Sequence, residues 1–230
     1  MINGMKKVLW SLALIVGLLL IAIVIKTLLF RSLQLESETV LLPVFEDSKI
    51  AHLSEAITFP TISYANDAPV DTVAFAGFHK FLEEAYPLIH KNLKKEVFSS
   101  FSLLYTWTGK DTSLKPVILT AHMDVVPAGE VDSWSHPPFS GENDGTYIWG
   151  RGTLDDKASL ISIMEAVEEL LTEGYTPERT VFLAFGHDEE ISGMKGAGVM
   201  AGALKERNID AEFLLDEGYA DTEEAALAIM

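Results

Sequence analysis

The chain has no cysteine among its 230 residues, and its 17 lysines and arginines are outnumbered by 34 aspartates and glutamates. The absence of cysteine excludes disulfides and zinc–thiolate sites, so any metal ligands must be histidines and carboxylates. The formal charge of −17 argues against a nucleic-acid partner, because nucleic acids bind to basic faces. The length suits one α/β domain with a core of its own plus a tail.

Only one long segment lacks charge, and it lies near the N-terminus. Residues 8–25 carry no charged side chain between Lys6-Lys7 and Lys26. A helix of this length approaches the roughly 20 residues needed to cross a bilayer. The alternative is a cleaved signal peptide, but its apolar region is usually about 7–15 residues and precedes an Ala-x-Ala pattern, which residues 27–32 lack. We therefore expect a membrane anchor over residues 1–30 and a polar stalk over residues 31–47.

The orientation of this anchor is not set by its flanking charges. Basic residues occur on both sides of the apolar run, so the positive-inside rule gives no clear answer. A lone N-terminal anchor usually leaves the body of the protein outside. We therefore expect a single-pass membrane protein whose remaining residues are extracytoplasmic.

Helical patterns alternate with short apolar runs along the rest of the chain. Apolar spacing predicts helices over residues 48–57, 73–86, 158–171 and 198–207. Buried strands are predicted over residues 117–120 and 180–185, a third strand over residues 213–215, and one edge strand over residues 97–107. This alternation implies parallel crossovers. The sequence therefore predicts an α/β fold with a doubly wound, mostly parallel sheet, preceded by one transmembrane helix.

Acidic and imidazole side chains follow three of the predicted strands and one glycine-containing turn. The candidates are His122, Asp124, Asp155, Glu189, Glu190 and Asp216. In open α/β sheets, ligands bind outside the carboxyl ends of the strands, where most of these residues are expected. Zinc binds imidazole nitrogen and carboxylate oxygen, and catalytic zinc keeps one position open for water. The set therefore has the composition of a two-metal hydrolytic site.

The first three candidates also have ordinary structural explanations. A lone His-x-Asp such as His122-Met-Asp124 is weak evidence, although in extended backbone Asp124 can accept from the second ring nitrogen of His122. Asp155 follows the turn at residues 150–152 and can bridge two cations. Asp155 can equally favour the N-terminal dipole of the following helix.

The last three candidates also have structural explanations when each is considered alone. Glu189 and Glu190 are adjacent, so their carboxylates point in different directions. One can bind a metal while the other approaches the attacking water. The pair can also be a solvated acidic loop, and Asp216 can be a helix N-cap. All the clusters fall at strand or turn ends, and this coincidence favours a metal site.

Four motifs together resemble those of the aminoacylase/carboxypeptidase S family of di-zinc metallopeptidases, the M20 peptidases. They are Ala-His-Met-Asp-Val-Val-Pro at 121–127, Trp-Ser-His-Pro-Pro-Phe-Ser-Gly at 134–141, Trp-Gly-Arg-Gly-Thr-Leu-Asp-Asp-Lys at 149–157 and Phe-Gly-His-Asp-Glu-Glu at 185–190. The Pro-Pro-Phe-Ser-Gly stretch and Asp-Glu-Gly at 216–218 most resemble carboxypeptidase S and the secreted N-acyl-amino-acid hydrolases. The resemblance covers residues 50–218.

The resemblance implies two zinc ions, with the ligands His122, Asp155, Glu190 and Asp216. It implies catalytic roles for Asp124, which would orient His122, and for Glu189, which would be the general base. The implied reaction is hydrolysis of an amide or peptide bond in a small peptide or N-acyl amino acid by a water activated between two metals. Ligands of this kind also accept Co²⁺ or Mn²⁺.

The family pattern includes two features that this sequence does not show. It has a late histidine that completes the second zinc site, and an inserted lid domain that binds the substrate carboxylate and often forms a homodimer. No histidine follows His187, and His52, His79 and His90 are expected on surfaces. We therefore expect residues 48–230 to be the N-terminal part of a zinc hydrolase catalytic domain. The alternative is a truncated, non-catalytic, membrane-tethered binding module that retains the fold.

Overall fold

The computed structural model describes residues 2–30, 46–65 and 68–217 of the chain. These residues form two compact units, Met1–Val44 and Phe45–Met230. The predicted stalk lies outside the described residues except for its last two positions. Each unit is described by itself.

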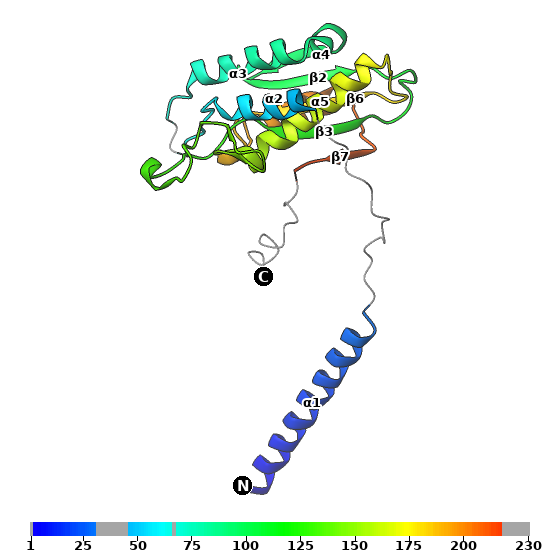
Figure 1. Ribbon diagram of the computed structural model, residues 1–230. Helices are drawn as coiled ribbons and strands as arrows, with labels where there is room; N and C mark the ends of the chain where they lie inside the picture. Colours follow the sequence, from blue (N-terminus) through cyan, green and yellow to red (C-terminus); the bar gives the residue numbers. More distant parts are fainter. Residues whose placement is uncertain (1, 31–45, 66–67, 218–230) are drawn as a thin grey trace. The chain divides into compact units, whose positions relative to one another are not determined.

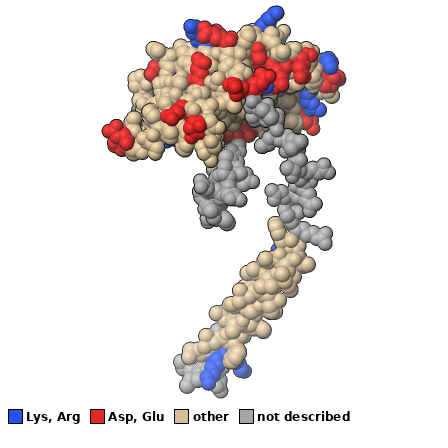
Figure 2. Space-filling model, in the orientation of Figure 1, with Lys and Arg blue, Asp and Glu red and all other residues tan. Residues whose placement is uncertain are grey.

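The first unit contains one helix, α1 (Ile2–Leu28). Its apolar side chains are exposed over most of its length, including Trp10, Leu19 and Leu28. Figure 2 shows this uncharged surface, with basic side chains near one end of the helix. By length and composition, α1 can cross a membrane, a property that it shares with signal sequences.

The second unit is built on a five-stranded mixed sheet with the order β1-β2-β6-β3-β7. The strands are β1 (Lys94–Phe98), β2 (Ser102–Trp107), β3 (Val117–His122), β6 (Val181–Gly186) and β7 (Phe213–Leu215). β3 pairs in parallel with both β6 and β7, whereas β2 is antiparallel to β1 and β6. Only β2 therefore runs against the others, and the expectation of a mostly parallel sheet in an α/β fold is confirmed (Figure 1).

Helices cover both faces of this sheet because the strands alternate their side chains between two apolar layers. Leu103, Tyr105, Leu183 and Phe185 face the larger layer. That layer is completed by α2 (Asp47–Ile57), α3 (Thr72–Ala85), α4 (Pro87–Asn92) and α5 (Ala158–Thr172). The other face packs against α6 (Ala197–Glu206) through contacts among Leu104, Phe182, Ala184, Met200 and Leu204.

The predicted single strand over residues 97–107 is wrong, because the chain reverses within it. Residues 99–101 form the turn of the β1–β2 hairpin. Ser99 and Ser100 adopt positive φ angles of 47° and 77°, which glycine and asparagine adopt more readily than serine. The sequence therefore carries no strong turn signal here. β1 is the edge strand, and β2 is almost fully buried inside the sheet.

The parallel strands bring their carboxyl ends to one edge of the sheet. His122 at the end of β3 is in register with Gly186 at the end of β6. The segment after β3 continues beside residues 61–63, since Ser63 N donates to Val125 O and Val125 N donates to Thr61 O, both at 3.0 Å. The turn η2 (Thr153–Lys157), which precedes α5, packs against β3. Candidate ligands from distant parts of the sequence therefore meet at this edge.

Candidate metal centre

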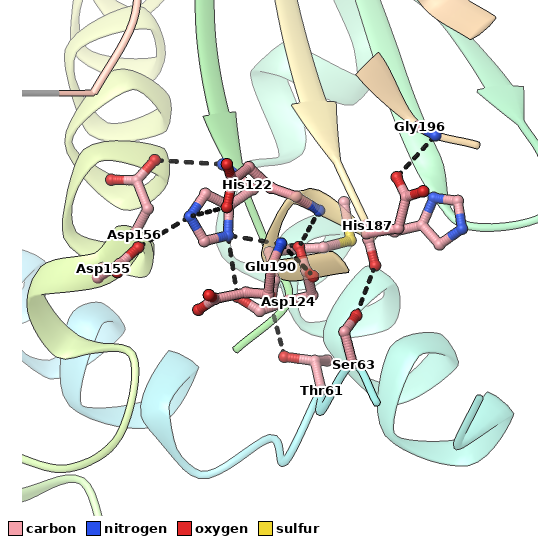
Figure 3. A network of polar contacts seen from close by, with 12 residues as sticks. Thr61, Ser63, His122, Asp124, Asp155, Asp156, His187, Glu190 and Gly196 are labelled. Atoms are coloured by element: carbon pink, nitrogen blue, oxygen red, sulfur yellow. Dashed lines mark hydrogen bonds and ion pairs between the residues drawn. The ribbon is translucent and has the colours of Figure 1, made fainter. Parts of the chain in front are cut away.

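His122 is the central residue of the site, and its two ring nitrogens face different groups. The side chain is buried, and Nδ1 lies 3.0 Å from the carbonyl oxygen of Asp124 and 3.3 Å from Oδ1 of the same residue. On the opposite side, Nε2 lies 2.9 Å from Asp155 Oδ1, 3.4 Å from Glu217 Oε2 and 3.8 Å from Glu189 Oε2. With Nδ1 donating to Asp124, Nε2 is directed at the carboxylates (Figure 3).

Asp124 holds both His122 and the Glu189–Glu190 turn in place. Its carboxylate is fully buried and accepts from the backbone N–H groups of Glu189 at 3.1 Å and Glu190 at 3.2 Å. Burial alone would raise the pKa of Asp124, but hydrogen bonds from His122 and Ser63 keep it below its ordinary value. Asp124 is therefore an ionised acceptor within the protein framework, and it fixes the groups that face the centre.

Asp155 and Asp156 reach His122 from the η2 turn. Asp155 is largely exposed and approaches the ring, whereas Asp156 is buried and accepts from the His122 backbone N–H at 3.2 Å. The second oxygen of Asp156, Oδ1, is buried without a hydrogen-bond partner in the described part of the chain. Burial raises the pKa of the Asp156 carboxyl. An unsatisfied carboxylate oxygen at this position is a suitable cation ligand.

The structure contains two groups of potential ligands, and both include His122. One consists of His122, Asp155 and Glu190, and the other of His122, Asp156 and Glu217; within each, the ligand atoms lie within 4.8 Å of one another. Glu190 also accepts from Val126 N at 3.1 Å, and burial, reinforced by Asp155, raises its pKa. Five of the six predicted site residues therefore meet here, namely His122, Asp124, Asp155, Glu189 and Glu190.

Asp216 lies nearby but belongs to neither ligand group. Its Oδ1 accepts from Glu217 N at 3.0 Å, and it lines a cavity of about 80 Å³ together with His122, Glu189 and Glu217. The carboxylate of Glu217, not that of Asp216, lies near His122 in the described structure. Sequence patterns missed Glu217 and Asp156 because adjacent acids project in different directions, and only the backbone geometry decides which one faces inward.

The electrostatics of the site favour a cation. Burial alone would lower the pKa of His122, but Asp124 and then Glu217 and Asp156 raise it to about 10. A potential that stabilises an imidazolium also stabilises a metal ion. One imidazole with several carboxylates is a ligand set that zinc, cobalt and manganese accept. The residues present therefore fit a divalent metal.

Two other histidines are less exposed than the sequence suggested. His79 and His90 were expected on surfaces, but both are half-buried in the α3–α4 layer. His79 Nε2 lies 2.9 Å from Phe101 O, and His90 Nε2 lies 2.9 Å from the Tyr105 hydroxyl. His187 is buried against Ser102, with Nδ1 2.6 Å from Oγ. These three rings therefore bind protein groups away from the two ligand groups.

The sheet and the side chains at its carboxyl edge define an α/β protein with a histidine–carboxylate cluster whose composition fits a divalent metal. The sequence pattern of Peptidase family M20/M25/M40 matches residues 118–229. The chain therefore contains a Peptidase M20 domain over these residues.

Curated relatives share substantial identity with most of the chain. Probable carboxypeptidase S-like 2 of Dictyostelium discoideum is 44% identical over 89% of this chain and 41% of its own length. Carboxypeptidase S of Saccharomyces cerevisiae is 43% identical over 76% of this chain and 32% of its own. Mouse N-fatty-acyl-amino acid synthase/hydrolase PM20D1 is 44% identical over 72% of this chain and 33% of its own. The chain thus spans well under half the length of these relatives.

Solved structures confirm the fold. An M20 family metallo-carboxypeptidase from Sulfolobus solfataricus gives a TM-score of 0.62 at 19% identity, over 78% of this chain and 39% of that chain. Human carnosine dipeptidase 1 gives 0.58 at 17% identity, over 75% of this chain and 38% of that chain.

Proposed function

We propose that residues 48–230 belong to the catalytic domain of a zinc-dependent hydrolase that cleaves the amide or peptide bond of a small peptide or N-acyl amino acid. The observation that carries this proposal is the convergence of His122 Nε2 with carboxylates from three separate segments at the carboxyl edge of the sheet. The substrate class is supported by relatives named carboxypeptidase S and N-fatty-acyl-amino acid synthase/hydrolase.

In this proposal, two zinc ions would be held by His122, Asp155, Glu190 and Asp216, of which Asp216 lines the cavity beside His122. When bound, zinc supplies Lewis acidity that polarises the scissile carbonyl and makes water more acidic. Asp124 keeps the Nδ1 proton of His122 in place, so that Nε2 presents its lone pair to the centre. Asp156 and Glu217 add negative charge and provide alternative carboxylate oxygens beside the same ring.

Glu189 is the proposed general base. Its carboxylate is half exposed and lies 3.8 Å from His122 Nε2, while its backbone N–H is held by Asp124. It can therefore reach a water at the open side of the centre while its main chain stays fixed. Glu189 takes a proton from that water and later delivers it to the leaving nitrogen.

Replacing Glu189 tests this assignment. Glu189→Ala and Glu189→Gln should reduce turnover by about 10²–10⁴-fold, the usual contribution of a general base, while zinc binding is largely retained. The assay is release of free amino acid from an N-blocked substrate by the whole protein, with bound zinc measured by atomic absorption. Glu173→Gln, an exposed glutamate at the far end of α5, is the matched control. Full activity in Glu189→Ala would remove Glu189 from the mechanism.

A non-catalytic binding module is the second candidate, because both described ligand groups depend on the same histidine. Zinc stoichiometry separates the two functions. Two tightly held ions per chain support the hydrolase, whereas a single ion without turnover supports the binding module.

We also propose that α1 is a single-pass membrane anchor that leaves the globular unit extracytoplasmic. The length and apolar composition of the helix support a membrane anchor, and the orientation follows the usual arrangement of a lone N-terminal anchor.

A further inference from the structure

Lys157 is a fully buried lysine in the globular unit. Its side chain has no exposed surface, and Nζ donates to the carbonyl oxygens of Ala56 at 2.9 Å and Phe59 at 2.6 Å. Nζ also lies 5.1 Å from the centre of the Phe78 ring. In the described residues, no carboxylate lies within ion-pair distance of this lysine. Burial lowers the pKa of Lys157 to about 7, and the amine donates hydrogen bonds in either protonation state.

The two carbonyl oxygens mark the end of α2. Ala56 lies in the last turn of this helix, and Phe59 follows it by a few residues. The last carbonyls of a helix have no intrahelical donors and carry partial negative charge, so a cation is favourable there. Lys157 therefore stabilises the end of α2 from a position far along the chain.

The segment after α2 supports Asp124. Thr61 Oγ1 donates to Met123 O at 2.6 Å, and residues 61–63 pair with the segment that contains Asp124. Ser63 Oγ also donates to the carbonyl oxygen of His187 at 3.3 Å, just before the Glu189–Glu190 turn. Fixing the end of α2 consequently fixes the support of the carboxylate that orients His122.

The backbone of Lys157 belongs to the turn that carries Asp155 and Asp156. Its N–H donates to Gly152 O at 3.0 Å and closes that turn. A Cβ at Gly150 would lie 2.3 Å from Ile57 of α2, and one at Gly152, where φ is +83°, would lie 2.3 Å from Val125. The turn is thus packed tightly between α2 and the Asp124 segment.

We propose that Lys157 is a positioning residue of the metal centre: its bonds to Ala56 and Phe59 hold the Asp155–Asp156 turn against the segment that carries Asp124. This inference rests on the proposed metal-dependent function. The Lys157 side chain points to the end of α2 and belongs to neither ligand group. It joins the end of α2 to the turn that carries Asp155 and Asp156, and a small tilt of this turn would change both ligand groups together.

Zinc affinity of the 230-residue chain tests this role, measured by competition with a chromophoric chelator. Lys157→Met keeps the length of the side chain but removes its charge and donors. It should weaken zinc binding by about 10–100-fold, the usual effect of losing a group that orients metal ligands. Lys157→Gln retains a donor for one carbonyl and should lose less. Lys80→Met, at an exposed ion pair on α3, should bind zinc like the unchanged chain.

Hydrogen–deuterium exchange provides a measurement that needs no metal. Lys157→Met should accelerate exchange of the backbone amides of residues 125 and 157 together. The first amide donates to Thr61 and the second to Gly152, and both hydrogen bonds depend on the contacts of Lys157 with Ala56 and Phe59. If the unchanged chain binds no zinc, the proposed function fails, and exchange alone decides the positioning role.

Three results would overturn the inference. The first is a folded Lys157→Met variant with unchanged zinc affinity, and the second is unchanged exchange at both amides. The third is failure of both Lys157 variants to fold, which would assign the lysine to general stability and not to the metal centre.

Discussion

Asp124 contributes to the site without facing its open side. The Asp124 carboxylate accepts hydrogen bonds from two backbone amides and lies 3.3 Å from Nδ1 of His122, and all three groups belong to residues of the centre. Such a hub can be satisfied only as an anion, because a protonated or amide side chain would present a hydrogen to another donor. The identity of this residue therefore affects several ligands at once.

Asp124→Asn should weaken zinc binding by about 10–100-fold. The amide matches aspartate in size, but its NH₂ group must face either His122 or one of the Glu189–Glu190 amides, which are themselves donors. Chelator competition measures the change. Asp132→Asn, at an exposed aspartate in the short helix η1 (Val131–Ser133), is the matched control. Equal affinities in the two variants would contradict a hub role for Asp124.

Elements with strong apolar patterns were predictable, and those defined by backbone geometry were not. The predicted strands over 117–120, 180–185 and 213–215 correspond to β3, β6 and β7. Buried parallel strands such as β3 and β6 require continuous apolar runs, whereas β7 carries such a run but is exposed. The β1–β2 turn was missed because two serines adopt positive φ. No helix was predicted over α4, because a proline directly after a helical pattern indicates the end of that helix. Proline also suits the first turn of a helix, as Pro87 does in α4.

The same distinction applies to the site. Motifs identified His122 and its partners because ligand type and strand ends are visible in sequence. Asp156 and Glu217 face inward because of the backbone conformation within η2 and after β7. The periodicity of the sequence carries no information about this conformation.

The serine turn provides a stability prediction at the element scale. Ser100→Gly should raise the free energy of unfolding by about 0.5–1 kcal/mol, since glycine relieves the cost of a left-handed residue at φ 77°, partly offset by greater freedom in the unfolded chain. Urea denaturation measures the change. Ser135→Gly, at a position without positive φ, should stabilise nothing. A neutral or negative effect of Ser100→Gly would contradict the argument from strain.

The packed layer of α3 and α4 should be sensitive to mild acid. Burial lowers the pKa values of His79 and His90 below the ordinary 6.5. The unfolded chain therefore binds more protons than the folded chain just below pH 6.5, and stability falls as the pH falls through this window. His90→Gln should reduce this slope in thermal or urea unfolding. Lys91→Gln, on the same helix, should leave the slope unchanged; a slope that His90→Gln does not alter would refute the linkage.

At the scale of the whole molecule, an apolar helix and an acidic globular unit have opposite preferences for solvent. The described apolar side chains of α1 are exposed along its length. The second unit has its own two apolar layers, and its visible surface is rich in acidic side chains (Figure 2).

These preferences can be separated by truncation. The full chain should partition into the detergent phase and resist carbonate extraction, whereas a chain starting at Phe45 should remain folded in the aqueous phase. Leu19→Arg, near the middle of α1, should reduce membrane insertion because a central arginine costs about 2.5–3.5 kcal/mol; Ala51→Arg, at an exposed position of α2, controls for general effects of the substitution. Mass spectrometry of the mature N-terminus tests the alternative of a signal peptide. Removal of α1 would identify a cleaved signal and exclude an anchor.

β7 has a consequence for handling the protein in concentrated solution. It is the last strand of the described sheet, and Phe213, Leu214 and Leu215 are 55%, 54% and 58% exposed. An apolar edge of this kind offers backbone hydrogen-bonding groups to any extended segment that approaches it. Self-association during expression and concentration should therefore begin at this strand. Leu214→Lys would place a charge on this edge and should improve solubility. The substitution lies away from the ligand groups at the end of β3.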